Sequence, residues 1–152
     1  RAYHDLTQQF KEHSTTKTYQ ALVMGRPEPP EGIIEAALAR DTRNRKRIAI
    51  SEEGRHATTR YKTLKCYKGY TLLEVQPLTG RTHQIRVHLS SIGYPVAGDR
   101  LYGGKTSLLQ RQFLHAAKLS VRLPSSREYT EFIASLPPDL EQALSELIPL
   151  PH

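Results

Sequence analysis

The segment from Leu78 to Leu89 constrains this chain more than any other stretch. It reads Leu-Thr-Gly-Arg-Thr-His-Gln-Ile-Arg-Val-His-Leu, and it gathers two arginines, two histidines and a glutamine around Gly80. A strand-like run precedes it and a helical period begins near Thr82. The first N–H groups of a helix are unpaired, and the helix dipole disfavours cations there unless an anion is present. We therefore predict that Arg81 meets a phosphate or carboxylate and that this segment holds a nucleic acid; a surface helix with solvated basic residues is the plain alternative.

The overall charge points the same way. The 152 residues suffice for one domain and carry 22 Lys and Arg against 15 Asp and Glu, which gives a net charge of +7. Such an excess favours RNA or DNA over a small neutral substrate, although many basic proteins simply carry solvated Lys and Arg faces. The single Cys66 excludes a disulfide framework, and no apolar run reaches the roughly 18 residues of a transmembrane helix. We expect a monomer in the reducing cytoplasm.

Hydrophobic periodicity divides the chain into strands and a few helices. Helices are predicted over residues 2–13, from Thr82 to Gly93, and at the C-terminus, where Asp139 is the expected N-cap. Strands are predicted over 16–25, 47–50, 57–66, 70–78 and 131–134; residues 33–34 are expected to be extended, and 113–122 either helical and then extended or extended throughout. This order predicts an α+β fold in one domain over 1–152, a mixed, largely antiparallel sheet with flanking helices.

Tyr19 and Lys17 lie on the strand predicted over residues 16–25. A tyrosine in a half-buried strand is usually a core residue with its hydroxyl at the rim, and contact with a substrate is the functional alternative. Lys17 shares the strand face of Tyr19, so it is either a phosphate contact or a solvated lysine.

Other kinds of site find little support. His83 and His88 diverge on a helix, and no cysteine or paired carboxylates complete a metal site. A Gly-x-Ser-x-Gly elbow is absent, and residues 103–106 (Gly-Gly-Lys-Thr) fit a phosphate loop poorly. The basic run over residues 40–47 stays open between a solvated loop and a phosphate contact.

Residues 79–88, together with the Ile-Gly-Tyr-Pro-Val-Ala-Gly-Asp run over 92–99, resemble the signature of the RluA-type RNA pseudouridine synthases. The resemblance continues at residues 17–25 and 112–116 and covers nearly the whole chain. It implies the pseudouridine synthase fold and isomerisation of uridine in rRNA or tRNA to its C5-glycoside, without metal or cofactor. The target nucleotide would be flipped out of the RNA, and an aspartate would act at the sugar or base while uracil leaves C1′, turns and rejoins through C5.

The resemblance also implies roles for single residues. Tyr19 corresponds to the tyrosine that stacks on uracil and helps to remove the C5 proton, and Arg81 to the cation that pairs with the catalytic aspartate. An aromatic face suits a flipped base, and a buried carboxylate stays ionised only beside a cation. The residues expected to shape the site or contact RNA are Lys17, Thr82, His83, Gln84 and Arg86.

The family's catalytic aspartate stands in a His-Arg-Leu-Asp motif, which this sequence does not contain. Asp99 matches a different family position, where a structural role is expected. We therefore expect the chain to be the C-terminal majority of a catalytic domain, without turnover alone, and Arg81 to be solvent-exposed or paired with a stray anion. The alternatives are a non-catalytic RNA-binding module and, more weakly, a DNA-binding domain, for which no recognition-helix motif is present.

Overall fold

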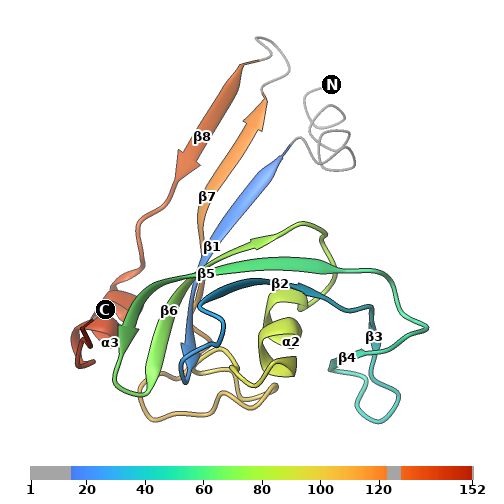
Figure 1. The fold of residues 1–152 in the computed structure, drawn as a ribbon, viewed down its shortest axis with the longest axis horizontal. Coiled ribbons are helices and arrows are strands. Elements are labelled where there is room, and N and C mark those ends of the chain that lie inside the picture. The colour runs from blue at the N-terminus through green and yellow to red at the C-terminus, as the bar shows by residue number, and fades with distance from the viewer. Residues whose placement is uncertain (1–14, 123–127, 152) are drawn as a thin grey trace.

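A six-stranded sheet dominates the computed structural model, which describes residues 15–122 and 128–151 (Figure 1). All pairings of the described strands in this sheet are antiparallel, which confirms the predicted α+β fold with a largely antiparallel sheet. Residues 113–122 are extended, and the helix predicted over 2–13 lies outside the described residues. In spatial order the strands are β2 (Glu31–Glu35), β5 (Thr58–Tyr67), β6 (Tyr70–Pro77), β1 (Thr16–Met24), β7 (Leu114–Arg122) and β8 (Tyr129–Ile133).

Strand β1 is central and is buried on both faces. Ala21 and Val23 share one core with Ile85 of helix α2 (Gln84–Ser91). Leu22 shares the other core with Leu140 of helix α3 (Pro138–Ser145). Successive side chains of a strand point to opposite faces, so the two helices cover opposite faces of the sheet. The predicted burial of this strand on both faces is confirmed.

Helix α2 begins two residues later than predicted. Thr82 is exposed and does not cap it; the N-cap is His83, whose φ of 55° lies in the left-handed region and whose side chain makes no cap hydrogen bond. The reason is a tight turn before the helix, in which Gln84 N–H donates to the Arg81 carbonyl at 3.1 Å. Gly93, with a φ of 93°, follows the C-cap and ends the helix as predicted.

A separate two-stranded sheet lies beside α2 and is formed by strands β3 (Leu38–Arg40) and β4 (Ile48–Ile50) (Figure 1). In the main sheet, β7, β8 and the N-terminal end of β1 project beyond the other strands (Figure 1). The prediction that Asp139 caps α3 is wrong: Pro137 is the N-cap, and Asp139 lies in the first turn, where its carboxylate accepts from Arg111 instead. No helix of the described ranges is long and apolar enough to cross a membrane.

A buried ion pair fixes the loop between Val96 and Gly104. Arg86 Nε donates to Asp99 Oδ2 at 2.8 Å, and Nη2 donates to Oδ1 at 3.0 Å. The side chain of Asp99 is 1% exposed and that of Arg86 is 14% exposed. A Cβ on Gly104 would collide with the Val96 carbonyl, so this glycine serves close backbone packing. Asp99 thus has the structural position expected for it.

His88 connects α2 to the sheet from inside the core. Its Nδ1 lies 2.7 Å from Thr59 Oγ1, and its Nε2 lies 3.0 Å from the Ala36 carbonyl oxygen. A carbonyl only accepts, so Nε2 carries the proton and Nδ1 accepts from the Thr59 hydroxyl. Burial lowers the pKa of His88 below its usual 6.5, against the opposing effect of the Ala36 hydrogen bond, and the ring is neutral in the folded chain.

Removing the charge of Asp99 should destabilise the chain strongly, because Arg86 would keep a largely buried charge without a partner. We expect Asp99→Asn to lower the free energy of unfolding by about 3 kcal/mol in urea denaturation. The matched control is Asp139→Asn, since Arg111 and Asp139 pair with similar geometry, at 2.7 and 3.0 Å, on the surface. An exposed pair contributes little, so equal losses in both variants would refute burial as the cause.

Stability should also depend on pH through His88. Its pKa is lower in the folded than in the unfolded chain, so the unfolded chain binds the proton first as the pH falls. Stability is therefore fully present above about pH 6.5 and declines below it. His88→Gln, which keeps a donor and an acceptor, should flatten the decline between pH 7 and 5. His115→Gln, outside the core, should leave it unchanged; an equal flattening there would contradict the assignment to His88.

Candidate active-site cleft

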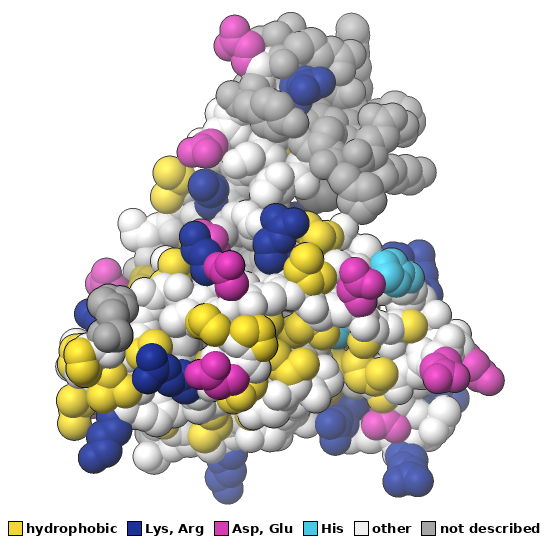
Figure 2. All heavy atoms as spheres, viewed as in Figure 1, with side chains coloured by type: hydrophobic (Ala, Val, Ile, Leu, Met, Phe, Trp, Pro, Cys, Tyr) yellow, Lys and Arg dark blue, Asp and Glu magenta, His cyan; other side chains and the backbone are white. Residues whose placement is uncertain are grey.

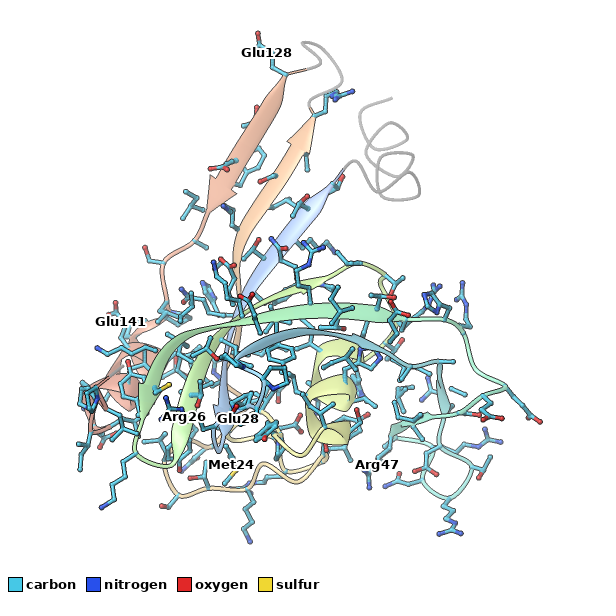
Figure 3. All side chains as sticks on the ribbon, in the orientation of Figure 1. Met24, Arg26, Glu28, Arg47, Glu128 and Glu141 are labelled. Atoms are coloured by element: carbon cyan, nitrogen blue, oxygen red, sulfur yellow. The ribbon has the colours of Figure 1, made fainter. Side chains whose placement is uncertain are left out.

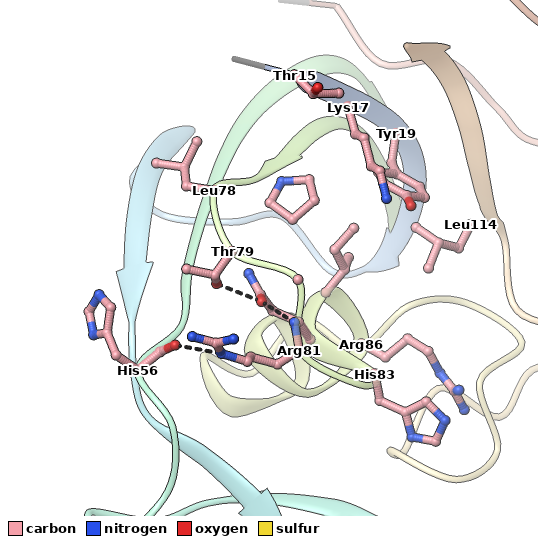
Figure 4. Close-up of a pocket in the computed structure, with 14 residues that line it drawn as sticks. Thr15, Lys17, Tyr19, His56, Leu78, Thr79, Arg81, His83, Arg86 and Leu114 are labelled. Atoms are coloured by element: carbon pink, nitrogen blue, oxygen red, sulfur yellow. Dashed lines mark hydrogen bonds between the residues drawn. The ribbon is translucent and has the colours of Figure 1, made fainter. Parts of the chain in front are cut away.

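An open cleft of about 930 Å³ lies on the α2 side of the sheet (Figure 4). Lys17 and Tyr19 project into it from β1, and the turn before α2 forms the opposite wall with Arg81. Six of the seven residues predicted for the site line this cleft, and the exception is Thr82. The structure thus brings together side chains that lie more than 60 positions apart in the sequence.

Arg81 is partly buried and bonded to the backbone of a neighbouring segment. Its Nε donates to the His56 carbonyl oxygen at 2.9 Å. Within residues 15–122 and 128–151, no carboxylate lies within 4.0 Å of its guanidinium. The expectation that Arg81 is solvent-exposed holds in part: the side chain is half-buried, because the His56 carbonyl holds its Nε at the wall. Its two Nη groups have no hydrogen-bond partner in the described chain and can receive an anion.

Gln84 holds the turn that carries Arg81. Its Oε1 accepts from the Thr79 hydroxyl at 2.7 Å and from the Arg81 N–H at 3.0 Å. Its Nε2 donates to the Thr58 carbonyl at 2.8 Å and to Thr59 Oγ1 at 2.9 Å. The side chain is 4% exposed, and all four hydrogen-bonding positions of the amide are filled. Of its two expected roles, the geometry supports shaping the site rather than contacting RNA.

His83 stands between this turn and the loop of residues 96–104. Its Nδ1 lies 2.8 Å from the Tyr102 hydroxyl, and the two rings meet edge to face with centroids 5.6 Å apart. Its left-handed backbone costs roughly 1 kcal/mol, which these contacts offset. Burial, and secondarily the charge of Arg86, lowers the pKa of His83, although Asp99 opposes the shift. His83 is therefore neutral near pH 7.

Arg86 lines the cleft, but its charge is already compensated. Its guanidinium group donates two hydrogen bonds to Asp99, which raise the pKa of Arg86. The Cζ of Arg86 also lies 5.0 Å from the Tyr102 ring centroid. Arg86 and Arg81 therefore differ in kind. Arg86 fixes the wall of the cleft, whereas Arg81 offers unpaired donors.

None of the described aspartates lines the cleft. Asp41 accepts from the Arg43 N–H at 2.8 Å in the β3–β4 turn, Asp99 binds Arg86, and Asp139 binds Arg111. Asp5 lies outside the described residues. In the described part of the chain, His, Cys, Asp and Glu side chains also form no group of three that could hold a metal ion. The cleft combines cations with a tyrosine and contains no described aspartate.

The basic run of residues 40–47 forms the β3–β4 turn. Arg43, Arg45 and Lys46 are exposed there, and Figure 3 shows Arg47 between this hairpin and α2. The Cζ of Arg47 lies 5.2 Å from the Tyr102 ring centroid. Over the face drawn in Figure 2, acidic and basic side chains are interspersed among hydrophobic ones. The β3–β4 turn thus carries more basic than acidic side chains next to α2.

Two residues that contribute to the site escaped the reasoning from sequence. His56 lies 25 positions before Arg81 and acts through its carbonyl, so its residue type gave no signal. Tyr102 lies 19 positions after His83 and reaches it only through the fold. The available hint was the resemblance to the family signature, which continues past Asp99 to Tyr102 and Gly103.

The chain is similar in sequence and in fold to known proteins of one family. Residues 1–91 match the family described as RNA pseudouridylate synthase. The chain is 49% identical over 148 residues to an "Uncharacterized RNA pseudouridine synthase" of Chloroflexus aurantiacus, with 96% of this chain and 46% of that protein covered. It is 38% identical over 161 residues to the ribosomal large subunit pseudouridine synthase D of Nitrosomonas europaea, with 99% and 46% covered.

A solved structure, human RNA pseudouridylate synthase domain containing 1, matches with a TM-score of 0.78 and 31% identity. The match covers 95% of this chain and 63% of that one. The chain spans about half the length of the curated relatives it matches. These agreements in sequence and fold confirm the resemblance at residues 79–99, and the chain belongs to the RNA pseudouridylate synthase family.

Proposed function

We propose that residues 1–152 form one domain, the C-terminal majority of the catalytic domain of an RNA pseudouridine synthase. This isomerase detaches uracil from C1′ of a uridine in structured rRNA or tRNA, turns the base and rejoins it through C5, which loses its proton. The observation that carries the proposal is the cleft in which Tyr19 and Arg81 occupy opposite walls. The proposed protein is a cytoplasmic monomer that uses neither metal nor cofactor.

Tyr19 is proposed as the residue that handles the base. Its ring packs against the core that contains Ala21 and Ile85, which holds it at the wall of the cleft. A fixed aromatic face can stack on a uracil flipped from the RNA, which offsets part of the few kcal/mol that unstacking costs. Its hydroxyl would then help to remove the C5 proton.

Arg81 is proposed as the partner of the catalytic aspartate. A guanidinium binds a carboxylate through two parallel hydrogen bonds and keeps it ionised. The Nη groups of Arg81 are available for such a pair, whereas Asp41, Asp99 and Asp139 are engaged elsewhere. We infer that the aspartate comes from a His-Arg-Leu-Asp segment outside this sequence.

The remaining residues divide by their surroundings. Lys17, Thr82 and His83 are proposed to contact RNA, because each is at least partly exposed at or beside the cleft. Gln84 and Arg86 shape the site through their buried hydrogen bonds. The β3–β4 hairpin adds a positive surface suited to phosphates.

Tyr19→Phe tests the proposed chemistry in a protein that also carries the His-Arg-Leu-Asp segment. The variant keeps the stacking face but loses the hydroxyl that helps to remove the C5 proton, so release of tritium from RNA with [5-³H]uridine should fall at least about 100-fold. RNA affinity should stay within about twofold. Tyr70→Phe, whose hydroxyl lies 2.6 Å from Thr106 Oγ1 away from the cleft, is the control and should turn over normally. Unchanged turnover in Tyr19→Phe would refute the proton-handling role, and RNA binding without turnover in the unaltered protein would favour the non-catalytic module.

RNA binding should be electrostatic and centred on the hairpin side. The logarithm of the binding constant should fall linearly with the logarithm of salt concentration, and Arg43→Gln with Lys46→Gln should reduce the slope by about 0.7 to 0.9 for each phosphate contact removed. The matched control is Arg60→Gln with Lys62→Gln, which removes the same charges from exposed positions on β5. Equal effects of the two pairs would show that only net charge matters, and binding that is independent of salt would refute the electrostatic footprint.

A further inference from the structure

Tyr102 is a buried aromatic residue that contacts His83, Arg86, Arg47 and Ile48. It is 4% exposed, and the guanidinium carbons of Arg47 and Arg86 lie 5.2 and 5.0 Å from its ring centroid. Its hydroxyl lies 2.8 Å from the Ile48 backbone nitrogen and 2.8 Å from His83 Nδ1. One buried hydroxyl therefore joins the β3–β4 hairpin to the turn that carries the site.

The hydrogen bonds at this hydroxyl fix the position of one proton on His83. The Ile48 N–H can only donate, so the Tyr102 oxygen accepts from it. The only other hydrogen-bond partner of this hydroxyl in the described chain is His83 Nδ1. If Nδ1 carried a proton, the tyrosine proton would be buried without an acceptor, which is costly. The satisfied arrangement has Tyr102 donating to an unprotonated Nδ1.

The other ring nitrogen of His83 is then the donor. Nε2 carries the proton, has no hydrogen-bond partner in the described chain and is not among its buried unpaired atoms, so it is not fully buried. His83 itself lines the cleft. We propose that Tyr102 is a positioning residue that locks His83 in the Nε2–H tautomer, so that His83 offers an uncharged hydrogen-bond donor to an oxygen of the bound RNA.

The surroundings of His83 favour an uncharged ring. Arg86 lies next to it, and Arg86 and burial together lower the pKa of His83, while Asp99 is already engaged with Arg86. The left-handed backbone at the helix N-cap is a rare conformation for a residue with a side chain, and the Tyr102 bond offsets its strain. The assignment of the acceptor as a uracil carbonyl or a phosphate oxygen of RNA rests on the proposed function. The assignment of the His83 tautomer does not.

The tautomer can be read directly by NMR on this chain labelled with ¹⁵N-histidine, with the His83 signals assigned by their loss in His83→Gln. We expect protonated Nε2 and unprotonated Nδ1 in the unaltered chain. Tyr102→Phe keeps the ring near Arg47 and Arg86 but removes the hydroxyl, and a measurable Nδ1–H population should appear. A protonated Nδ1 in the unaltered chain, or an unchanged His83 spectrum in Tyr102→Phe, would overturn the proposal.

A matched control separates this role from general destabilisation. Tyr61 is also 4% exposed, and its hydroxyl donates to the Pro29 carbonyl at 2.9 Å. Tyr61→Phe therefore loses one buried hydroxyl elsewhere in the core and should leave the His83 tautomer unchanged. If Tyr61→Phe moved the His83 signals as far as Tyr102→Phe does, the positioning role would fail.

Ligand titrations then test the donor role of Nε2–H. A uridine-containing single-stranded oligonucleotide should shift the Nε2–H signal of His83 and shift it less in Tyr102→Phe. Uridine alone and inorganic phosphate alone distinguish a base carbonyl from a phosphate oxygen, and a response to either supports the donor. No response to any of the three ligands would refute it. Because none of these measurements requires turnover, a failure of the synthase proposal would leave the tautomer result standing.

Discussion

The amide of Gln84 is the interaction on which the site depends. It joins four groups from two segments, because its oxygen binds Thr79 and Arg81 and its nitrogen binds Thr58 and Thr59 of β5. A carboxylate at this place could not donate to β5, and an apolar side chain would leave several buried polar groups unpaired. The position of Arg81 at the cleft wall is therefore set by a residue that need not touch RNA.

The two arginines of the 78–89 segment have opposite electrostatic roles. Arg86 is compensated by a carboxylate that is 1% exposed, so its charge stabilises the wall and contributes little to attracting RNA. Arg81 donates through Nε to one carbonyl, and its two Nη groups stay available for an anion. The difference arises from the partners and not from the residue type. It explains how a site rich in cations can be built without like charges forcing it apart.

Tyr102 links the turn before α2 to the β3–β4 hairpin. Its backbone nitrogen lies 3.3 Å from Asp99 Oδ1, two guanidinium carbons lie 5.0 and 5.2 Å from its ring centroid, and its hydroxyl meets His83 and the Ile48 N–H of β4. Tyr102 thus contacts both the basic hairpin and the turn that forms one wall of the cleft. In the proposed synthase, RNA phosphates bound at the hairpin and a base bound in the cleft would be oriented by the same side chain.

The sequence by itself determined most of the strands, the helix that ends at Gly93, the α+β class and the family, because alternation, period and a specific motif are local properties. It also predicted six residues that line the cleft. It did not predict strand β3, and it left residues 113–122 open between helix and strand. It misjudged the start of α2, since the Gln84 bonds that shape the preceding turn depend on β5. Only the tertiary structure decided which arginine is compensated, that Gln84 is a support, and that His56 and Tyr102 belong to the site, because each of these depends on contacts between residues distant in sequence.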